Sequence, residues 1–402
     1  MKTIRDMNVV NKRVILRLDL NVPLKDGQIV DDFRIKASLE TINYLINNQA
    51  KVIILSHLGR IKSNEDKKKY SLEIVASRLK ELLGKEVYFS KDNFSNDLID
   101  RVNMMQNGEV LVLENTRFLD YPNKLESSCD AQLSLFWSSL GDIFCNDAFA
   151  CSHRKHASTY GISLYLPSCI GFLMERELNN LDRLVINAIH PFTVIMGGAK
   201  IDDKIDLFSS ILSKCEYLLC GGGIANTCLY VLGFNVGDSI HSHNPEILNR
   251  VKELLYKYRS KIMVPLDVIV GSSYDKNYIK YKTINEIDSD DVILDVGVKT
   301  LQKYNKAIST SQTIFINGTV GKYEDIRYAN GTKELLKLIS QTDAVTVVGG
   351  GDAASSVNNF GYHDKMTYIS SGGGATLDYL SYGKLVALEK IMEGDSIETL
   401  DI

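Results

Sequence analysis

The chain has 402 residues, of which 45% are hydrophobic and 24% are charged, and its formal net charge at pH 7 is −4. This composition is typical of a soluble globular protein with two or three domains. It excludes a protein that binds nucleic acid or an anionic membrane through a strong overall positive charge. The seven cysteines show no CxxC spacing, and the N-terminus has no apolar signal segment. We therefore expect a cytoplasmic protein with reduced thiols.

The first half of the chain alternates strand and helix patterns. Apolar runs typical of strands lie within residues 12–23, 50–60, 108–118 and 140–158, and helical periodicity lies within 31–46 and 70–84. The charged run 64–69 is expected to be a solvated loop. Strands that alternate with helices predict a parallel sheet.

Polar or basic side chains follow each of these strands or begin the helix after it. Because the carboxyl ends of parallel strands meet at one edge of a sheet, we expect these side chains to converge there. A planar guanidinium binds phosphate or carboxylate through two parallel hydrogen bonds. The pattern therefore predicts an anion site formed by Arg34, His57, Arg60, Arg117 and Arg154.

A long helical pattern without internal Gly or Pro covers residues 171–189 and is expected to connect two domains. In the second half, apolar strands repeatedly end in glycines, in segments 191–200, 216–226, 291–297, 313–321, 344–356 and 366–376. A single glycine-rich strand end is an ordinary turn, but six favour a ligand site at the carboxyl edge of a sheet.

These glycine turns suit phosphate, because bare backbone N–H groups and helix N-termini attract anions. Asp352 follows the glycines of the 349–351 turn and could hold Mg²⁺ on that phosphate. The second half contains neither GxxxxGK[ST] nor a GxGxxG motif in a first strand–helix unit, which disfavours P-loop and NAD-binding proteins.

An anion site in one domain and a polyphosphate site in the other favour phosphoryl transfer. That reaction needs positioning and charge stabilisation more than a protein nucleophile, and no Ser-His-Asp or Cys-His arrangement is evident. Two sites on separate domains imply that the domains close to align donor and acceptor and to exclude water.

Twelve ordered motifs make the chain resemble the phosphoglycerate kinase family over essentially its full length. They are RLDLNVP (17–23), DDFRI (31–35), SHLGR (56–60), LENTRF (113–118), NDAF (146–149), HRKHAS (153–158), GFLMERE (171–177), GGAKIDDK (197–204), GGGIANT (221–227), NGTVGKYE (317–324), GGGD (349–352) and SGGGAT (371–376).

The resemblance implies an α/β protein of two Rossmann-like domains, each a parallel β-sheet flanked by helices, joined by a long interdomain helix. The implied 3-phosphoglycerate-binding domain covers 1–170, with the tail 388–402 packing back on it. The helix covers 171–189, and the nucleotide-binding domain covers 190–387. The implied reaction is Mg²⁺-dependent transfer between 1,3-bisphosphoglycerate with ADP and 3-phosphoglycerate with ATP, by a cytoplasmic monomer.

The resemblance also assigns site residues by position. Those implied for the acid substrate are Asp19, Leu20, Asn21, Arg34, His57, Leu58, Gly59, Arg60, Arg117 and Arg154. Those implied for the nucleotide are Lys200, Lys204, Gly221, Gly222, Gly223, Gly297, Asn317, Glu324, Gly350, Gly351, Asp352 and Ala353. The implied catalytic residues are Arg34, Lys200, Gly350 and Gly373, and the implied metal ligand is Asp352.

The chain departs from the family pattern at three places. Ala353 stands where the family has Thr or Ser, INGTVGKYE (316–324) replaces WNGP-x-GVFE, and ACSHRKH (150–156) replaces GTAHRAH. The expected result is weaker nucleotide binding with the chemistry retained. Two alternatives remain, a non-catalytic or nucleotide-weakened relative and a phosphotransferase that acts on a different acid.

Overall fold

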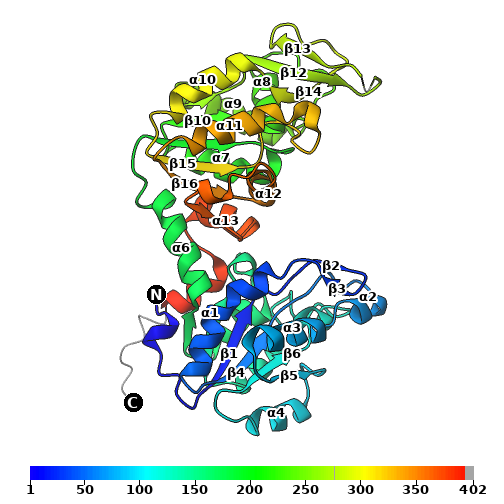
Figure 1. Ribbon diagram of the computed structural model, residues 1–402, viewed down its shortest axis with the longest axis vertical. Coiled ribbons are helices and arrows are strands. Elements are labelled where there is room, and N and C mark those ends of the chain that lie inside the picture. The colour runs from blue at the N-terminus through cyan, green and yellow to red at the C-terminus, as the bar shows by residue number, and fades with distance from the viewer. Residues whose placement is uncertain (276, 394–402) are drawn as a thin grey trace. The chain divides into compact units, whose positions relative to one another are not determined.

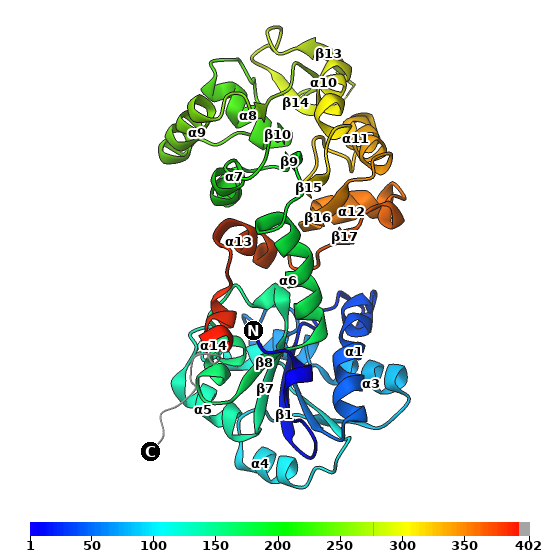
Figure 2. The same ribbon diagram turned by 90° about the vertical axis from the view of Figure 1, so that its left-hand side faces the viewer.

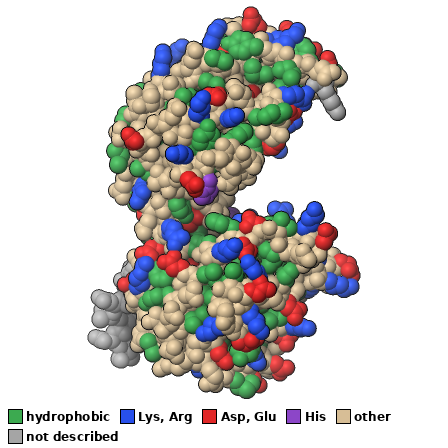
Figure 3. Space-filling model, viewed as in Figure 1, with side chains coloured by type: hydrophobic (Ala, Val, Ile, Leu, Met, Phe, Trp, Pro, Cys, Tyr) green, Lys and Arg blue, Asp and Glu red, His purple; other side chains and the backbone are tan. Residues whose placement is uncertain are grey.

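The computed structural model describes residues 1–275 and 277–393 and divides into two compact units (Figure 1). Among the described residues, the first comprises Met1–Leu178 and Lys384–Glu393, and the second comprises Asn179–Gly383. On the face shown in Figure 3, basic and acidic side chains are interspersed, as the small net charge leads one to expect. None of the helices in the described ranges combines the length and apolar character needed to cross a bilayer.

The first unit is built on a parallel sheet with the strand order β5-β6-β4-β1-β7-β8. Its strands are β1 (Arg13–Leu18), β4 (Lys51–Leu55), β5 (Val87–Ser90), β6 (Val110–Leu113), β7 (Ile143–Asp147) and β8 (Ser168–Ile170). A short hairpin, β2 (Leu24–Lys25) with β3 (Gln28–Ile29), follows β1.

Helices cover both faces of this sheet, because successive strand residues point to opposite sides. Val14 and Leu16 of β1 pack in one apolar cluster with α1 (Phe33–Asn47) and α3 (Glu73–Leu83). Ile15 packs in the other cluster with α4 (Asn96–Asn103) and α5 (Ala131–Ser139). Figure 2 shows α1 and α3 on one side of the sheet and α5 on the other.

The second unit contains another parallel sheet, with the strand order β11-β10-β9-β15-β16-β17. Its strands are β9 (Phe192–Met196), β10 (Tyr217–Cys220), β11 (Ile262–Met263), β15 (Thr313–Asn317), β16 (Val345–Gly349) and β17 (Tyr368–Ile369). Its helices are α7 (Ile205–Ile211), α8 (Gly222–Val231), α9 (Pro245–Lys257), α10 (Val298–Ile308), α11 (Asn330–Ser340), α12 (Gly351–Asn359) and α13 (Gly374–Tyr382). The predicted fold class, two parallel sheets flanked by helices, is confirmed.

Two strand predictions in the second unit were only partly right. The apolar run 261–271 predicts a single strand, but it divides around Pro265 into β11 and β12 (Asp267–Ser272). Proline lacks an N–H and restricts the residue before it, so it interrupts a strand. β12 pairs antiparallel with β13 (Lys280–Thr283) and β14 (Asp291–Val296), so the 291–297 segment lies outside the parallel sheet.

The predicted loop at 64–69 is wrong, because these residues form α2 (Asn64–Lys69). Ser63 caps it, with Oγ accepting from the backbone N–H of Asp66 at 3.2 Å. Acidic residues lie in its first turn and lysines in its last, an order that complements the helix dipole. Capping and charge order outweigh the lack of an apolar face, since none of its residues is buried.

Helix α6 (Phe172–Val185) lies within the segment predicted as the connector, and the boundary between the two units falls inside it. In the second unit, the Tyr379 hydroxyl of α13 donates to Asp182 Oδ1 of α6 at 2.6 Å. After α13 the chain continues into α14 (Glu389–Glu393), and the backbone N–H of Ala387 donates to the carbonyl of Ser152 in the first unit at 3.0 Å. The part of the predicted tail at 394–402 lies outside the described residues.

Asp147, at the end of β7, ties the start of α6 to the first sheet. Its carboxylate accepts from the Thr41 hydroxyl at 2.6 Å and from the Met174 N–H at 2.8 Å. Gly171 leaves room for it, because a Cβ there would lie 2.3 Å from the carboxyl carbon. Burial raises the pKa of Asp147 to about 6, although these hydrogen bonds act to lower it.

We expect Asp147→Asn to remove a pH-dependent part of the first unit's stability. A carboxyl whose pKa is raised by folding binds protons more tightly in the folded state. Its contribution is therefore full below about pH 4 and declines as the pH rises to about 6. The loss amounts to about 3 kcal/mol at most, at about 1.4 kcal/mol for each pKa unit.

The measurement is urea unfolding followed by fluorescence of Trp137, the only tryptophan, which is fully buried in the first unit. The difference in unfolding free energy, wild type minus variant, should fall between those pH values. Parallel pH curves for the two proteins would contradict the assignment.

Candidate active site

The loops after β1 and β4 are joined at the carboxyl edge of the first sheet. Asn21 Oδ1 accepts from the Gly59 N–H at 2.8 Å, and the Leu20 N–H donates to Ser56 Oγ at 2.9 Å. The Leu20 and Leu58 side chains are fully buried in the core. Those two leucines therefore anchor the loops, and only their backbone groups can serve a ligand.

The loop after β6 closes onto the same place. Asn115 Nδ2 donates to the carbonyl of Leu58 at 2.7 Å, and Arg117 donates to the carbonyl of Gly59. Arg34, from the first turn of α1, forms an ion pair with Asp19. Three of the predicted residues, Arg34, Asp19 and Arg117, are thus fixed by contacts with the loops around them.

Arg17, which is 1% exposed, belongs to the same cluster of side chains, and the sequence reasoning did not select it. Its Nε donates to Ser158 Oγ at 2.8 Å, and a terminal nitrogen approaches His57 Nδ1 at 3.4 Å. Ser158 in turn donates to the buried Glu126. The sequence contains a signal for Arg17, because an arginine inside an apolar strand is expected to be buried and then needs a polar partner in the interior.

The site is electropositive with neutral histidines. The pKa of His57 lies well below its ordinary value because of burial and then the Arg17, Arg117 and Arg34 guanidiniums. The pKa of His156 is lowered to about 4, again by burial first and then by nearby arginines. Clustered guanidiniums with uncharged imidazoles form a site for an anion.

The remaining two predicted arginines are exposed. Arg154 Nε donates to His153 Nε2 at 3.1 Å, and its charge contributes to the lowered pKa of Arg117, after burial and Arg17. Arg154 therefore borders the cluster. Arg60 is exposed, and within the described part of the chain no hydrogen bond or ion pair fixes its side chain.

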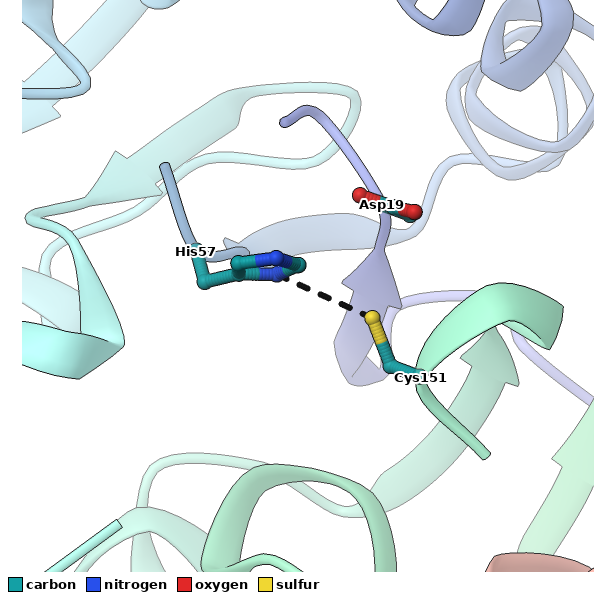
Figure 4. Close-up of side chains that lie close together, drawn as sticks. All are labelled: Asp19, His57 and Cys151. Atoms are coloured by element: carbon teal, nitrogen blue, oxygen red, sulfur yellow. Dashed lines mark hydrogen bonds between the residues drawn. The ribbon is translucent and has the colours of Figure 1, made fainter. Parts of the chain in front are cut away.

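Cys151 lies against His57 and is a second residue that the sequence reasoning did not assign to the site. Its Sγ is 3.7 Å from His57 Nδ1 (Figure 4). Asp19 completes the group, since one ligand atom of each residue lies within 4.8 Å of the others. The segment from β7 to Ser158 thus places a thiol in the middle of the arginine cluster.

In the second unit, glycine turns follow five neighbouring strands of the parallel sheet, β10, β9, β15, β16 and β17. Several of these glycines are needed for close packing of one turn on another. A Cβ on Gly223 would lie 1.9 Å from the carbonyl oxygen of Ala199, and one on Gly222 would lie 2.6 Å from that of Gly198. A Cβ on Gly221 would likewise lie too close to Val320, and a Cβ on Gly297 would lie too close to the buried carboxyl group of Asp267.

Other glycines of the predicted site are open. Nothing lies within 4 Å of a Cβ built on Gly351 or Gly373, at the starts of α12 and α13. Gly350 precedes α12 and differs from them, because its φ is +93° and a Cβ there would lie 3.0 Å from Asn317 Nδ2. The backbone of Gly351 and Gly373 is therefore open to a ligand, whereas Gly221–Gly223 and Gly297 act mainly as spacers between backbone segments.

Charged side chains border these turns. Lys204 Nζ donates to the carbonyl of Gly197 at 2.9 Å, and burial lowers its pKa while Asp352 raises it. Asp352 is exposed in the first turn of α12, and Lys200 and Glu324 are exposed on loops. Asn317 Nδ2 donates to the carbonyl of Gly349 at 2.8 Å, while its buried Oδ1 accepts no hydrogen bond within the described ranges.

A family model described as Phosphoglycerate kinase matches residues 4–384. The chain belongs to the phosphoglycerate kinase family. A phosphoglycerate kinase of Lactobacillus delbrueckii subsp. bulgaricus is 42% identical over 386 residues, 94% of this chain and 95% of that protein. The structure of phosphoglycerate kinase from Coxiella burnetii superposes with a TM-score of 0.87 at 35% identity, covering 97% of this chain and 98% of that one. The enzyme from Pyrococcus horikoshii OT3 gives 0.81 at 32% identity, covering 98% and 100%.

The structure shows what surrounds two of the residues at which the chain departs from the phosphoglycerate kinase pattern. Thr319 stands where the family motif has proline, yet its backbone carbonyl accepts from the Gly198 N–H at 3.0 Å, a bond that any residue can supply. Ala353 is fully buried in an apolar cluster with Val357. The first change leaves the turn packing intact, and the second removes a hydroxyl from the helix start.

An added methyl group should have very different effects on stability in the two classes of glycine. Gly223→Ala should destabilise the second unit by at least about 1–3 kcal/mol, because its Cβ would clash with a backbone oxygen. The matched variant Gly351→Ala should change stability by no more than about 0.5 kcal/mol, since its Cβ meets open space.

Urea unfolding followed by far-ultraviolet circular dichroism checks this, with Trp137 fluorescence reporting the first unit separately. Equal stability of the two variants would show that the turns do not pack as described.

Proposed function

We propose that this chain catalyses reversible phosphoryl transfer between 1,3-bisphosphoglycerate with ADP and 3-phosphoglycerate with ATP. The observation that carries the proposal is the family match over residues 4–384, in a chain that retains the whole predicted arginine set. No separate observation favours a phosphotransferase for a different acid or a non-catalytic relative.

The proposed acid site is the first unit's arginine cluster. Arg34, Arg117 and Arg154 would bind the phosphate and carboxylate of 3-phosphoglycerate, with Arg60, the 57–59 loop, Asp19 and Asn21 completing the site. The Asp19–Arg34 ion pair supports this role, because it holds a guanidinium that is 35% exposed in one orientation. Arg34 would also offset the charge of the phosphoryl group in transit.

The proposed nucleotide site is the set of turns in the second unit. Lys200 and Lys204 would contact phosphates, and the Gly350, Gly351 and Gly373 N–H groups would stabilise the moving charge. Glu324 would accept from the ribose hydroxyls, and the Gly221–Gly223 turn with Gly297 would border the base.

Mg²⁺ fits the residues present in this second site. It binds proteins through one or two carboxylates and keeps its other positions for water and substrate phosphates. Asp352 supplies an exposed carboxylate directly after the open glycines, and the unpaired Asn317 Oδ1 is a further oxygen acceptor beside them. When bound, Mg²⁺ would neutralise part of the nucleotide's charge.

The domain roles given from the sequence are part of the same proposal. The first unit would bind the acid and the second the nucleotide, and closure of the two would align the reactants and exclude water. We also propose a cytoplasmic monomer, as the family resemblance implies.

The direct test is ATP formation from 1,3-bisphosphoglycerate and ADP, with the reverse reaction from 3-phosphoglycerate and ATP. Replacing 3-phosphoglycerate by acetate separates the proposed enzyme from a general carboxylate kinase. Turnover with 3-phosphoglycerate alone supports the proposal. Turnover with acetate alone, or none with either acid, would overturn it.

Arg34→Ala should lower kcat by about 10²- to 10³-fold, the usual effect of losing one preorganised group that stabilises transition-state charge. KM for 3-phosphoglycerate should rise by much less, because the charge is needed most during transfer. Arg34→Lys, which keeps the charge but loses the planar fork, should recover part of kcat. A higher KM at unchanged kcat would assign Arg34 to binding alone.

Ala353→Ser should strengthen ADP binding by up to about tenfold, since one hydrogen bond contributes about 0.5–1.5 kcal/mol. We choose serine and not threonine as the substitution, because Ala353 is fully buried and a single added heavy atom disturbs the packing around it least. Calorimetric titration of both proteins with ADP and Mg²⁺ gives the affinities. Equal affinities would show that this position does not limit nucleotide binding.

A further inference from the structure

The three side-chain types that bind zinc lie close together at one place in the first unit, in a cluster formed by Asp19, His57 and Cys151. They come from three separate segments at the edge of the first sheet; His57 and Cys151 point toward each other, and Asp19 lies close to both (Figure 4). The sequence departs from the family pattern at this cluster, because Cys151 stands where the family motif GTAHRAH has threonine. Threonine offers no comparable ligand for a soft cation.

The spacing suits a tetrahedral ion. Zinc lies about 2.3 Å from sulfur and about 2.0 Å from imidazole nitrogen, so the two ligand atoms around it are about 3.5 Å apart. Cys151 Sγ and His57 Nδ1 are 3.7 Å apart, and one Asp19 oxygen lies within 4.8 Å of the sulfur and of a ring nitrogen of His57. The pair needs almost no adjustment, and only the partly exposed Asp19 has to turn inward.

The lone pair of His57 Nδ1 is directed into the cluster. A guanidinium can only donate, so the approach of Arg17 to Nδ1 at 3.4 Å places the imidazole proton on Nε2. Arg17 also donates to Ser158 Oγ at 2.8 Å and to the carbonyl of Leu18. A cation at Nδ1 would displace only the longest of the three Arg17 contacts.

The charges of the cluster also match a divalent ion. A thiolate and a carboxylate together neutralise two positive charges, and the Asp19 carboxylate has lone pairs for both a metal and Arg34. The surrounding guanidiniums repel a cation, so the ligands themselves must supply the selectivity. Sulfur ligation therefore selects a soft ion such as Zn²⁺ over the hard Mg²⁺.

We propose that Asp19, His57 and Cys151 form a binding site for a soft divalent cation, with Zn²⁺ as the representative ion. A second consequence rests on the proposed function: since Asp19 and His57 belong to the acid site, the cation and 3-phosphoglycerate exclude each other. The cation is therefore a competitive inhibitor with respect to the acid substrate.

The first test measures binding without activity, using Co²⁺ as a spectroscopic substitute for Zn²⁺. Wild-type protein, reduced and freed of metals, is titrated with Co²⁺ and followed by the thiolate-to-cobalt charge-transfer absorption. One equivalent should produce the band, Zn²⁺ should abolish it, and excess Mg²⁺ should leave it unchanged. Absence of the band, or its loss in excess Mg²⁺, would overturn the site.

Two variants locate the ligand. Cys151→Thr, which restores the family residue, should lose the band and weaken Zn²⁺ binding by about 100-fold or more, since even outer-shell partners are worth 10- to 100-fold. Cys129→Ser is the matched control, because Cys129 is the only cysteine in the described ranges that is not buried. Loss of the band in Cys129→Ser, or its persistence in Cys151→Thr, would refute the assignment.

A second test measures inhibition, independently of the cobalt titration that measures binding. In the coupled assay, Zn²⁺ should raise KM for 3-phosphoglycerate in the wild type without changing kcat, and Cys151→Thr should be resistant. Inhibition that is equal in both proteins, or not competitive with the acid, would overturn the inhibitory role. If the wild type showed no turnover, the proposed function would fail while the cobalt spectra still decided the metal site.

Discussion

The parallel register of β1 with its two neighbours determines where the site of the first unit lies. Arg17 stands opposite Leu55 of β4 and Asn146 of β7, and Leu18 stands opposite Asp147. The loops that leave these three strands therefore start at the same level of the sheet. One shift of register would move every side chain to the opposite face and separate the arginine cluster from its loops.

The sequence predicts this arrangement well where a residue's role follows from its place at a strand end. Arg117 and the glycine turns of the second unit fall into that class, and Arg34 was found in a similar way, from its place at the start of a helix that follows a strand. Arg17 does not, because its importance comes from burial and from contacts with Ser158 and His57, which are distant in sequence. Pattern reasoning also joined β11 and β12, since it counts apolar residues and does not show which neighbours a strand pairs with.

The glycines show a second limit of sequence reasoning. Gly223 and Gly351 lie in similar motifs, GGGIANT and GGGD, and look equally suited to phosphate. In the fold, a side chain on Gly223 would strike a carbonyl oxygen, whereas one on Gly351 meets open space. Only tertiary packing distinguishes a glycine that lets two backbone segments approach each other from one that leaves its amide N–H accessible to a ligand.

The hydrogen bond from Tyr379 to Asp182 links α13 to α6. Helix α13 begins at the 372–374 turn, and α6 carries Asp182. Both residues lie in the second unit, and Asp182 lies just past the point inside α6 where the two units divide. The bond therefore attaches the C-terminal part of α6 to the second unit through a specific side-chain contact.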